Sequence, residues 1–124
     1  MVKTKSQNMN IEEYRDYCLG FKGVSETFPF DNETLVFKVM GKMFALTHVN
    51  DFGSITLKCD QEKAVILREQ YKEVDPGYHM NKKFWNTIRV DGKIPDPLLK
   101  EWIRDSYRLV VEGLPKKQQK QLDD

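Results

Sequence analysis

The order and spacing of apolar residues predict an α+β domain, a two-layer fold in which helices pack on one face of a mostly antiparallel sheet. Apolar and polar residues alternate over 54–59, as they do in half-buried strands, and Leu35, Phe37 and Val39 share one face of a strand-like run over 34–40. Apolar residues recur every three or four positions over 11–19, 61–71 and after 96, which is helical spacing. The expected order is therefore helix, three strands, helix, one or two strands, helix.

Length and composition predict one domain with polar ends. The chain has 124 residues, 40% of them hydrophobic and 31% charged, as in ordinary soluble proteins. We expect a flexible N-terminal tail over 1–9, a single domain over 10–115 and a polar C-terminal tail over 116–124. No apolar run approaches the roughly 20 residues of a membrane helix, and no apolar region of a secretory signal follows Met1, so a cytoplasmic protein is expected.

The first helix is predicted over Ile11–Leu19. Asn10 is placed to cap it, and acidic residues stand in its first turn, where the helix dipole favours them. Residues 24–32 are interpreted as a linker. Phe28 and Phe30 within it are expected to be buried in the core, because aromatic rings bury large areas there, and a binding role is the alternative.

Three strands are predicted next, over 34–40, 43–49 and 54–59. Short turns join them, which favours an antiparallel meander with one solvated face. A helix should follow Asp60 and run to Tyr71, with Arg68 among the charged residues of a solvated face.

The last two main elements are a strand and the longest helix. The strand is predicted over 85–90, alone or with a short companion, and the helix from Asp96, with Trp102 on its buried stripe. Because side chains alternate along a strand, Ile88 lies with Asn86 and Val90 on the core face. The opposite face, away from the core, should carry Trp85, Thr87 and Arg89.

The stretch from Pro76 to Thr87 is unusually rich in side chains suited to binding. Its twelve positions hold three aromatic residues, one histidine, two lysines and two asparagines. Aromatic rings supply rigid contact area, whereas lysine, histidine and asparagine supply charge and directional hydrogen bonds. We expect a binding surface formed by Tyr78, His79, Asn81, Lys82, Lys83, Trp85, Thr87, Arg89 and Lys93.

Composition and spacing argue against several other functions. The formal net charge is +1, so any basic surface must be local. Cys18 and Cys59 are expected to be small buried residues, with a disulfide as the alternative, and no Cys or His pair has zinc spacing. No phosphate-binding loop or nucleophile motif occurs, so neither an enzyme nor a cofactor is expected, although His79 could act as an acid or base.

Several segments carry a family resemblance: residues 67–71, 76–87 and 91–96, together with 34–39, 41–46, 106–111 and 114–117. They resemble the MmcQ/YjbR family, and the likeness covers nearly the whole chain after Asn10. It implies a small two-layer fold similar to CyaY and to secretion-chaperone-like proteins, and a DNA-binding role through strands and turns. One position departs from the family motif, because Phe84 stands before Trp85 where a histidine is expected.

The function expected from the sequence is non-enzymatic binding of nucleic acid, most simply DNA, by a monomer. Lysines and arginines of the surface would meet phosphates, while its rings and amides would stack on bases or bond to them. A protein-interaction or chaperone-like adaptor is the alternative. The surface could also be structural, with Lys82 and Lys83 merely solvated and Tyr78 and Trp85 closing the core.

Overall fold

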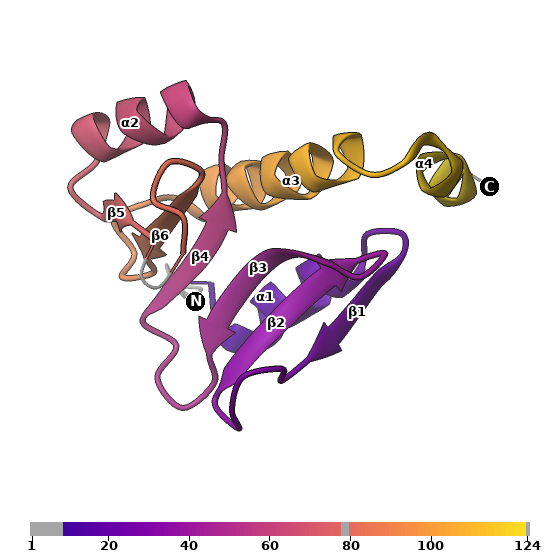
Figure 1. Cartoon of the computed structure of the whole chain (residues 1–124). Helices are drawn as coiled ribbons and strands as arrows, with labels where there is room; N and C mark the ends of the chain where they lie inside the picture. The colour runs from indigo at the N-terminus through magenta and orange to yellow at the C-terminus, as the bar shows by residue number, and fades with distance from the viewer. Residues whose placement is uncertain (1–8, 78–79, 124) are drawn as a thin grey trace.

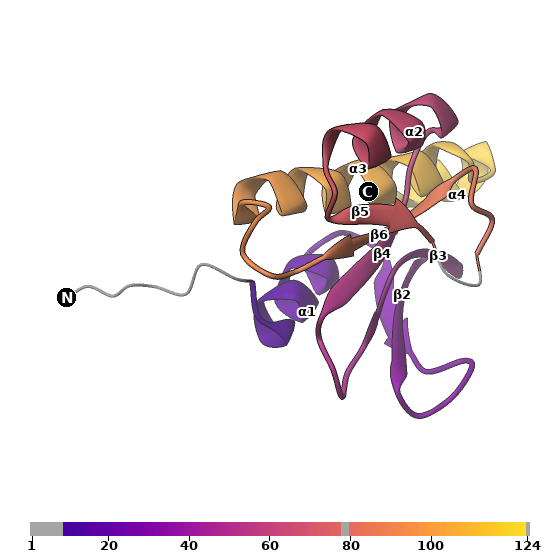
Figure 2. The same cartoon turned by 90° about the vertical axis from the view of Figure 1, so that its left-hand side faces the viewer.

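The computed structural model describes residues 9–77 and 80–123. Within them, helices pack against a six-stranded antiparallel sheet, which confirms the predicted α+β class (Figures 1 and 2). None of the helices described is long and apolar enough to cross a membrane. The elements are α1 (Ile11–Leu19), β1 (Val24–Thr27), β2 (Thr34–Val39), β3 (Lys42–His48), β4 (Ser54–Lys58), α2 (Gln61–Gln70), β5 (Val74–Pro76), β6 (Trp85–Arg89), α3 (Asp96–Glu112) and α4 (Lys116–Asp123).

Local signals account for where the first two helices begin. The Asn10 side chain accepts from the Glu13 backbone N–H, and the Glu13 carboxylate accepts from the Asn10 N–H, forming a capping box at α1. At α2 the Asp60 carboxylate accepts from the backbone N–H groups of Glu62 and Lys63. The predicted starts of both helices are confirmed.

The sheet has the strand order β1-β2-β3-β4-β6-β5, and every neighbouring pair is antiparallel. β2, β3 and β4 form the predicted meander, and β5 is the short companion of β6. The register between β2 and β3 shifts after Phe37, which pairs with Ala45, while Lys38 pairs with Met43. Phe44 is the extra residue of this bulge, and it lies in the same core as Ala45.

The main core lies between the sheet and helices α1, α2 and α3. In Figure 1, α1 lies behind β2 and β3. Tyr14 of α1 packs edge-on against Phe37 of β2, and its hydroxyl donates to the Leu46 carbonyl at 3.1 Å. Ser106 of α3 is fully buried, donates to the Phe44 carbonyl at 2.6 Å and accepts from the Lys58 N–H at 2.9 Å. Ser106 therefore satisfies backbone groups of two strands.

The prediction of a linker over 24–32 is wrong in its first part, because Val24–Thr27 forms β1 and pairs with β2. The expected burial of two phenylalanines is also wrong, since Phe28 is 46% exposed and Phe30 is 62% exposed. Thr27 pairs with Val36, so the residues after Thr27 extend beyond the sheet into the β1–β2 loop. There the aromatic rings have no core to enter.

The ends of the chain are more structured than expected. Residues 1–8 of the predicted N-terminal tail lie outside the described residues, but Met9 is buried and its N–H donates to Asp96 at 3.0 Å. The predicted C-terminal tail forms α4 instead. Leu122 of α4 packs against the main core and lies close to Gly23 and Met40, which gives this polar segment an anchor.

Candidate nucleic-acid interface

The motif singled out in the sequence forms the loop between β5 and β6, residues 77–84, hereafter the β5–β6 loop. At its base the Gly77 N–H donates to the Trp85 carbonyl at 2.8 Å. Before β6 begins, the Asn81 side chain accepts from the Lys83 N–H at 3.0 Å, and the Asn81 carbonyl accepts from the Phe84 N–H at 3.1 Å. The second half of the loop is therefore a hydrogen-bonded turn.

Arg68 of α2 fastens this turn to the body of the domain. Its Nε donates to the Asn86 side-chain oxygen at 2.8 Å, and its Nη2 donates to the Lys82 carbonyl. Asn86 is only 1% exposed, and its amide nitrogen donates to the Ala64 carbonyl at 3.3 Å. Sequence reasoning placed Arg68 on a solvated face and missed this role. The signal available was an arginine on the helix just before the motif, together with an asparagine at a core-facing strand position.

Gly77 leaves no room for a side chain. A Cβ at this position would lie 2.8 Å from the Trp85 Cβ and 3.1 Å from the Trp85 carbonyl oxygen. We expect Gly77→Ala to lower the free energy of unfolding by about 1–2 kcal/mol, as overpacking does. Urea denaturation measures the change. Gly20→Ala, at a helix end where the new Cβ would meet nothing closer than 3.4 Å, is the matched control, and equal stability of the two variants would contradict this contact.

The structure brings together only part of the predicted site. Asn81, Lys82 and Lys83 lie side by side in the chain and are exposed in the β5–β6 loop, whereas Tyr78 and His79 lie outside the described residues. Arg89 and Lys93 are also exposed, but they lie toward the opposite end of β6. Each strand residue adds about 3.3 Å along β6, so these two side chains are far from the β5–β6 loop. The Arg89 Nη2 donates to the Lys72 carbonyl, so this guanidinium already has a backbone partner.

Trp85 and Thr87 do lie away from the main core, but side chains of other strands pack against them. Trp85 is only 8% exposed and packs with Val36 and Leu46 in a second, smaller cluster on the open face of the sheet, the face that none of the described helices covers. The Thr87 hydroxyl lies 3.0 Å from the Thr56 hydroxyl, in hydrogen-bonding contact. Little of the Trp85 ring is therefore available for stacking against a base.

The open face also carries a cavity of about 510 Å³, hereafter the open-face cavity. Its lining is rich in hydroxyl groups and includes one imidazole, one carboxylate and the exposed ring of Phe30. Met80 of the β5–β6 loop is part of the wall, so the cavity adjoins the loop that carries Lys82 and Lys83. The lining residues are Phe30, Asp31, Thr34, Leu46, Thr47, His48, Ser54, Thr56, Met80 and Thr87. Sequence reasoning missed this cavity.

Asp31 gives the open-face cavity a fixed negative charge. Its carboxylate accepts from the backbone N–H of Glu33 at 2.8 Å and from that of Thr34 at 2.7 Å. These bonds hold the pKa of Asp31 below its usual range, and the bond from the Glu33 N–H has the largest effect. An ionised carboxylate here can accept from amino groups, and it repels phosphate.

Sequence comparisons place this arrangement in a family. Residues 19–109 match the model of the family YjbR. The chain belongs to the YjbR family. It is 41% identical over 96 residues to the uncharacterised protein YbdF of Escherichia coli O157:H7, covering 77% of this chain and 79% of YbdF. It is 32% identical over 115 residues to the uncharacterised protein YjbR of Escherichia coli K12, and the match covers 92% of this chain and 98% of that protein.

Solved structures share the YjbR-family fold described above. Protein DR2400 of Deinococcus radiodurans matches with a TM-score of 0.88 and 39% identity, covering 95% of this chain and 91% of DR2400. A protein from Pseudomonas syringae matches with a TM-score of 0.68 and 26% identity, and the match covers 82% of this chain and 98% of that protein.

Proposed function

We propose that this YjbR-family protein binds nucleic acid, without catalysing a reaction, through the β5–β6 loop and the adjoining open-face cavity. The observation that supports the proposal best is the combination of two exposed lysines with a hydroxyl-lined cavity beside them. Within the described part of the chain, Lys82 and Lys83 form no ion pair, so their charges are free for a ligand.

The two parts of this surface suit different parts of a nucleotide. Lys82 and Lys83 would meet phosphates, which position a strand without reading its sequence. The open-face cavity would take a base, with hydroxyl groups and His48 as hydrogen-bonding partners and Asp31 accepting from base amino groups. Phe30, at 62% exposed, offers the ring for stacking that Trp85 does not.

A concave cavity favours single strands over duplexes. A base can enter it only when it is unstacked and unpaired, which costs little in a single strand. With two local lysines and a net charge of +1, the affinity is expected to be modest and strongly dependent on salt.

The double variant Lys82→Gln/Lys83→Gln tests the proposal. We expect it to weaken binding of a short single strand most at low salt, and to reduce the slope of log affinity against log salt by about 1.4, the value for two lost phosphate contacts. Fluorescence anisotropy with labelled single-stranded and duplex oligonucleotides measures both quantities.

Lys116→Gln/Lys117→Gln is the matched control, because it removes the same charge from exposed positions on α4. This control should bind as the unaltered protein does. No salt-sensitive binding by the unaltered protein, or equal loss in both double variants, would contradict the proposed site.

A protein-interaction role is the second candidate, and the exposed rings of Phe28 and Phe30 favour it. They lie in the β1–β2 loop, next to an edge strand that could pair with a partner strand. Sedimentation at increasing concentration separates the candidates. A monomer that binds oligonucleotides supports the first, whereas self-association that Phe28→Ser/Phe30→Ser abolishes supports the second.

The remaining expectations also belong to this proposal. A cytoplasmic location is inferred from the sequence, and a likeness to CyaY is implied by the resemblance to the MmcQ/YjbR family. Both stay predictions, as does the absence of enzymatic activity.

A further inference from the structure

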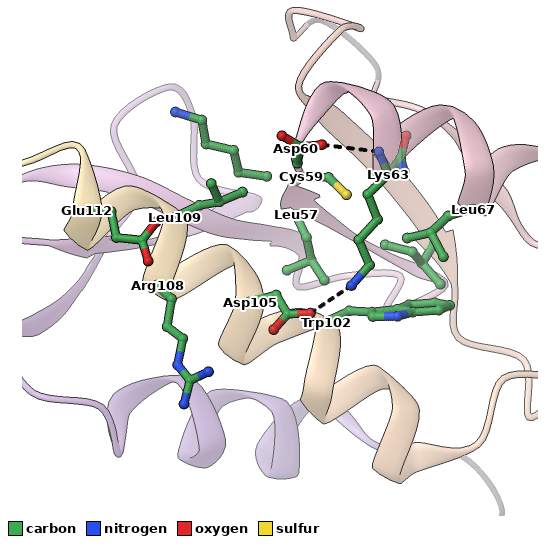
Figure 3. Close-up of a pocket in the computed structure, with 13 residues that line it drawn as sticks. Leu57, Cys59, Asp60, Lys63, Leu67, Trp102, Asp105, Arg108, Leu109 and Glu112 are labelled. Carbon is green, nitrogen blue, oxygen red and sulfur yellow. Dashed lines mark hydrogen bonds and ion pairs between the residues drawn. The ribbon is translucent and has the colours of Figure 1, made fainter.

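A second cavity of about 260 Å³ lies between α2 and α3, on the helix side of the sheet (Figure 3), and is hereafter the α2–α3 cavity. The proposed nucleic-acid surface does not use it. Its floor and walls are mainly apolar. The apolar lining residues are Leu57 of β4, Leu67 of α2, Ile88 of β6, and Trp102 and Leu109 of α3.

The ring of Trp102 has a fixed place in this cavity. It is 5% exposed and packs edge-on against Tyr71, with 5.3 Å between ring centroids, which holds the indole at the wall of the cavity. Buried Leu57 and Leu67 come from the sheet and from the facing helix. The cavity is a gap between packed helices and strands, and an apolar ligand in it would make contacts that the lining side chains now lack.

Hydrogen-bonding groups stand at one side of the α2–α3 cavity. Lys63 of α2 reaches Asp105 of α3, with 3.1 Å between Nζ and Oδ2, and this bond bridges the two helices (Figure 3). Both side chains are well exposed, so the pair is weak and can exchange partners. The two groups present a donor and an acceptor to anything that reaches the rim.

The charges around the α2–α3 cavity balance. Its lining includes three cationic residues and three acidic ones: Lys58, Lys63 and Arg108, and Asp60, Asp105 and Glu112. A charged ligand would lose hydration without meeting an excess of opposite charge, so this balance disfavours both anions and cations. The polar Asn86 in the wall already has partners for its amide nitrogen and oxygen.

We propose that the α2–α3 cavity is a binding site for an uncharged small molecule with an apolar ring and one hydrogen-bonding group. The ring would lie among Leu57, Leu67 and Trp102, and the polar group would bond to Lys63 or Asp105. Cavities of about 150 Å³ hold benzene, and those for drug-sized ligands begin at about 300 Å³, so this site fits a ring with a short chain.

Three probes with the same phenylbutyl group test the preference for a neutral ligand. They are 4-phenylbutanol, 5-phenylpentanoate and 4-phenylbutylamine, whose four-methylene chains carry a neutral, an anionic or a cationic head group. Trp85→Phe leaves Trp102 as the single tryptophan, so its fluorescence reports binding in the α2–α3 cavity. We expect saturable binding of the alcohol, at least fivefold tighter than that of the acid or the amine.

Cys59 provides an independent readout in the unaltered protein. Its thiol lines the α2–α3 cavity and is partly exposed, whereas Cys18 is buried. Burial raises the pKa of the Cys59 thiol, so slow alkylation at moderately alkaline pH is the suitable assay. We expect 4-phenylbutanol to slow alkylation of Cys59 at the concentrations that change Trp102 fluorescence, and Cys59→Ser identifies the labelled residue.

Filling the α2–α3 cavity completes the test, and all measurements are made without nucleic acid. Leu109→Phe should abolish binding of the alcohol, whereas Val65→Phe, at a 46% exposed position of α2 outside the lining, should not change it. Circular dichroism shows that each variant is folded. No saturable binding of the alcohol and no protection of Cys59, or a charged probe binding as tightly as the alcohol, would overturn the proposal.

Discussion

Replacing Ser106 with alanine is expected to lower the free energy of unfolding by about 2–4 kcal/mol, since two buried backbone groups lose their partner. The Ser106 hydroxyl donates to the Phe44 carbonyl and accepts from the Lys58 N–H, and the side chain is fully buried. Alanine can replace neither bond, and the site is too enclosed for water to restore both. Urea denaturation followed by circular dichroism measures the loss.

The reason lies at the end of the pairing between β3 and β4. Ala45 pairs with Leu57, and the next residue on each strand, Phe44 on β3 and Lys58 on β4, has its backbone group bonded to the Ser106 hydroxyl of α3. Ser25→Ala, on the exposed edge strand β1, is the control and should change stability by less than about 0.5 kcal/mol. A Ser106→Ala variant as stable as this control would show that the Phe44 and Lys58 backbone groups do not depend on α3.

Replacing Arg68 with alanine should affect both stability and binding. The buried Asn86 side-chain oxygen would lose its donor, which costs about 1–3 kcal/mol of unfolding free energy. The turn at Lys82 would also lose its bond to α2, so Lys82 and Lys83 would sample more orientations and bind phosphate less well. Urea denaturation and oligonucleotide anisotropy measure the two effects.

Arg104→Ala removes an equal charge from an exposed position on α3 and serves as the control. It should leave stability almost unchanged and reduce oligonucleotide binding far less than Arg68→Ala does. If the two variants behaved alike, charge alone would explain the loss, and Arg68 would have no positioning role.

Elements with strong local signals were predictable from the sequence. Asn10 and Asp60 cap their helices through side-chain bonds to backbone only two or three residues away, and these signals can be read without a fold. The buried stripe of α3 follows from periodicity in the same way, and it includes Leu99, Trp102 and Ile103. The meander followed from alternation and short turns.

Elements that depend on distant partners were not predictable. Two of the four residues of β1 are Ser25 and Glu26, and this strand forms because β2 offers it an edge. α4 is polar, and Leu122 becomes an anchor only where the fold brings Gly23 and Met40 nearby. Such contacts have no signature within a window of sequence.

The candidate site shows the same division. Exposure of Lys82 and Lys83 in a turn could be predicted from their neighbours, and so could the direction of Trp85 away from the core. The burial of Trp85 by Val36 and Leu46 depends on the strand order. The hydrogen bond from Arg68 to the Lys82 carbonyl depends on where α2 lies. Both cavities are gaps between elements that are distant in the sequence, so they could not be predicted from it.

An amide chemical-shift titration of labelled protein with a short single strand, at low and moderate salt, tests the proposed interface most directly. We expect shifts at residues 80–84 and around the open-face cavity, at Thr34, His48, Thr56 and Thr87, and we expect them to fade as salt rises. A duplex of the same sequence should shift fewer of the cavity residues. No shifts at either salt concentration, or shifts confined to the helix side of the domain, would contradict the proposal that the β5–β6 loop and the open face bind nucleic acid.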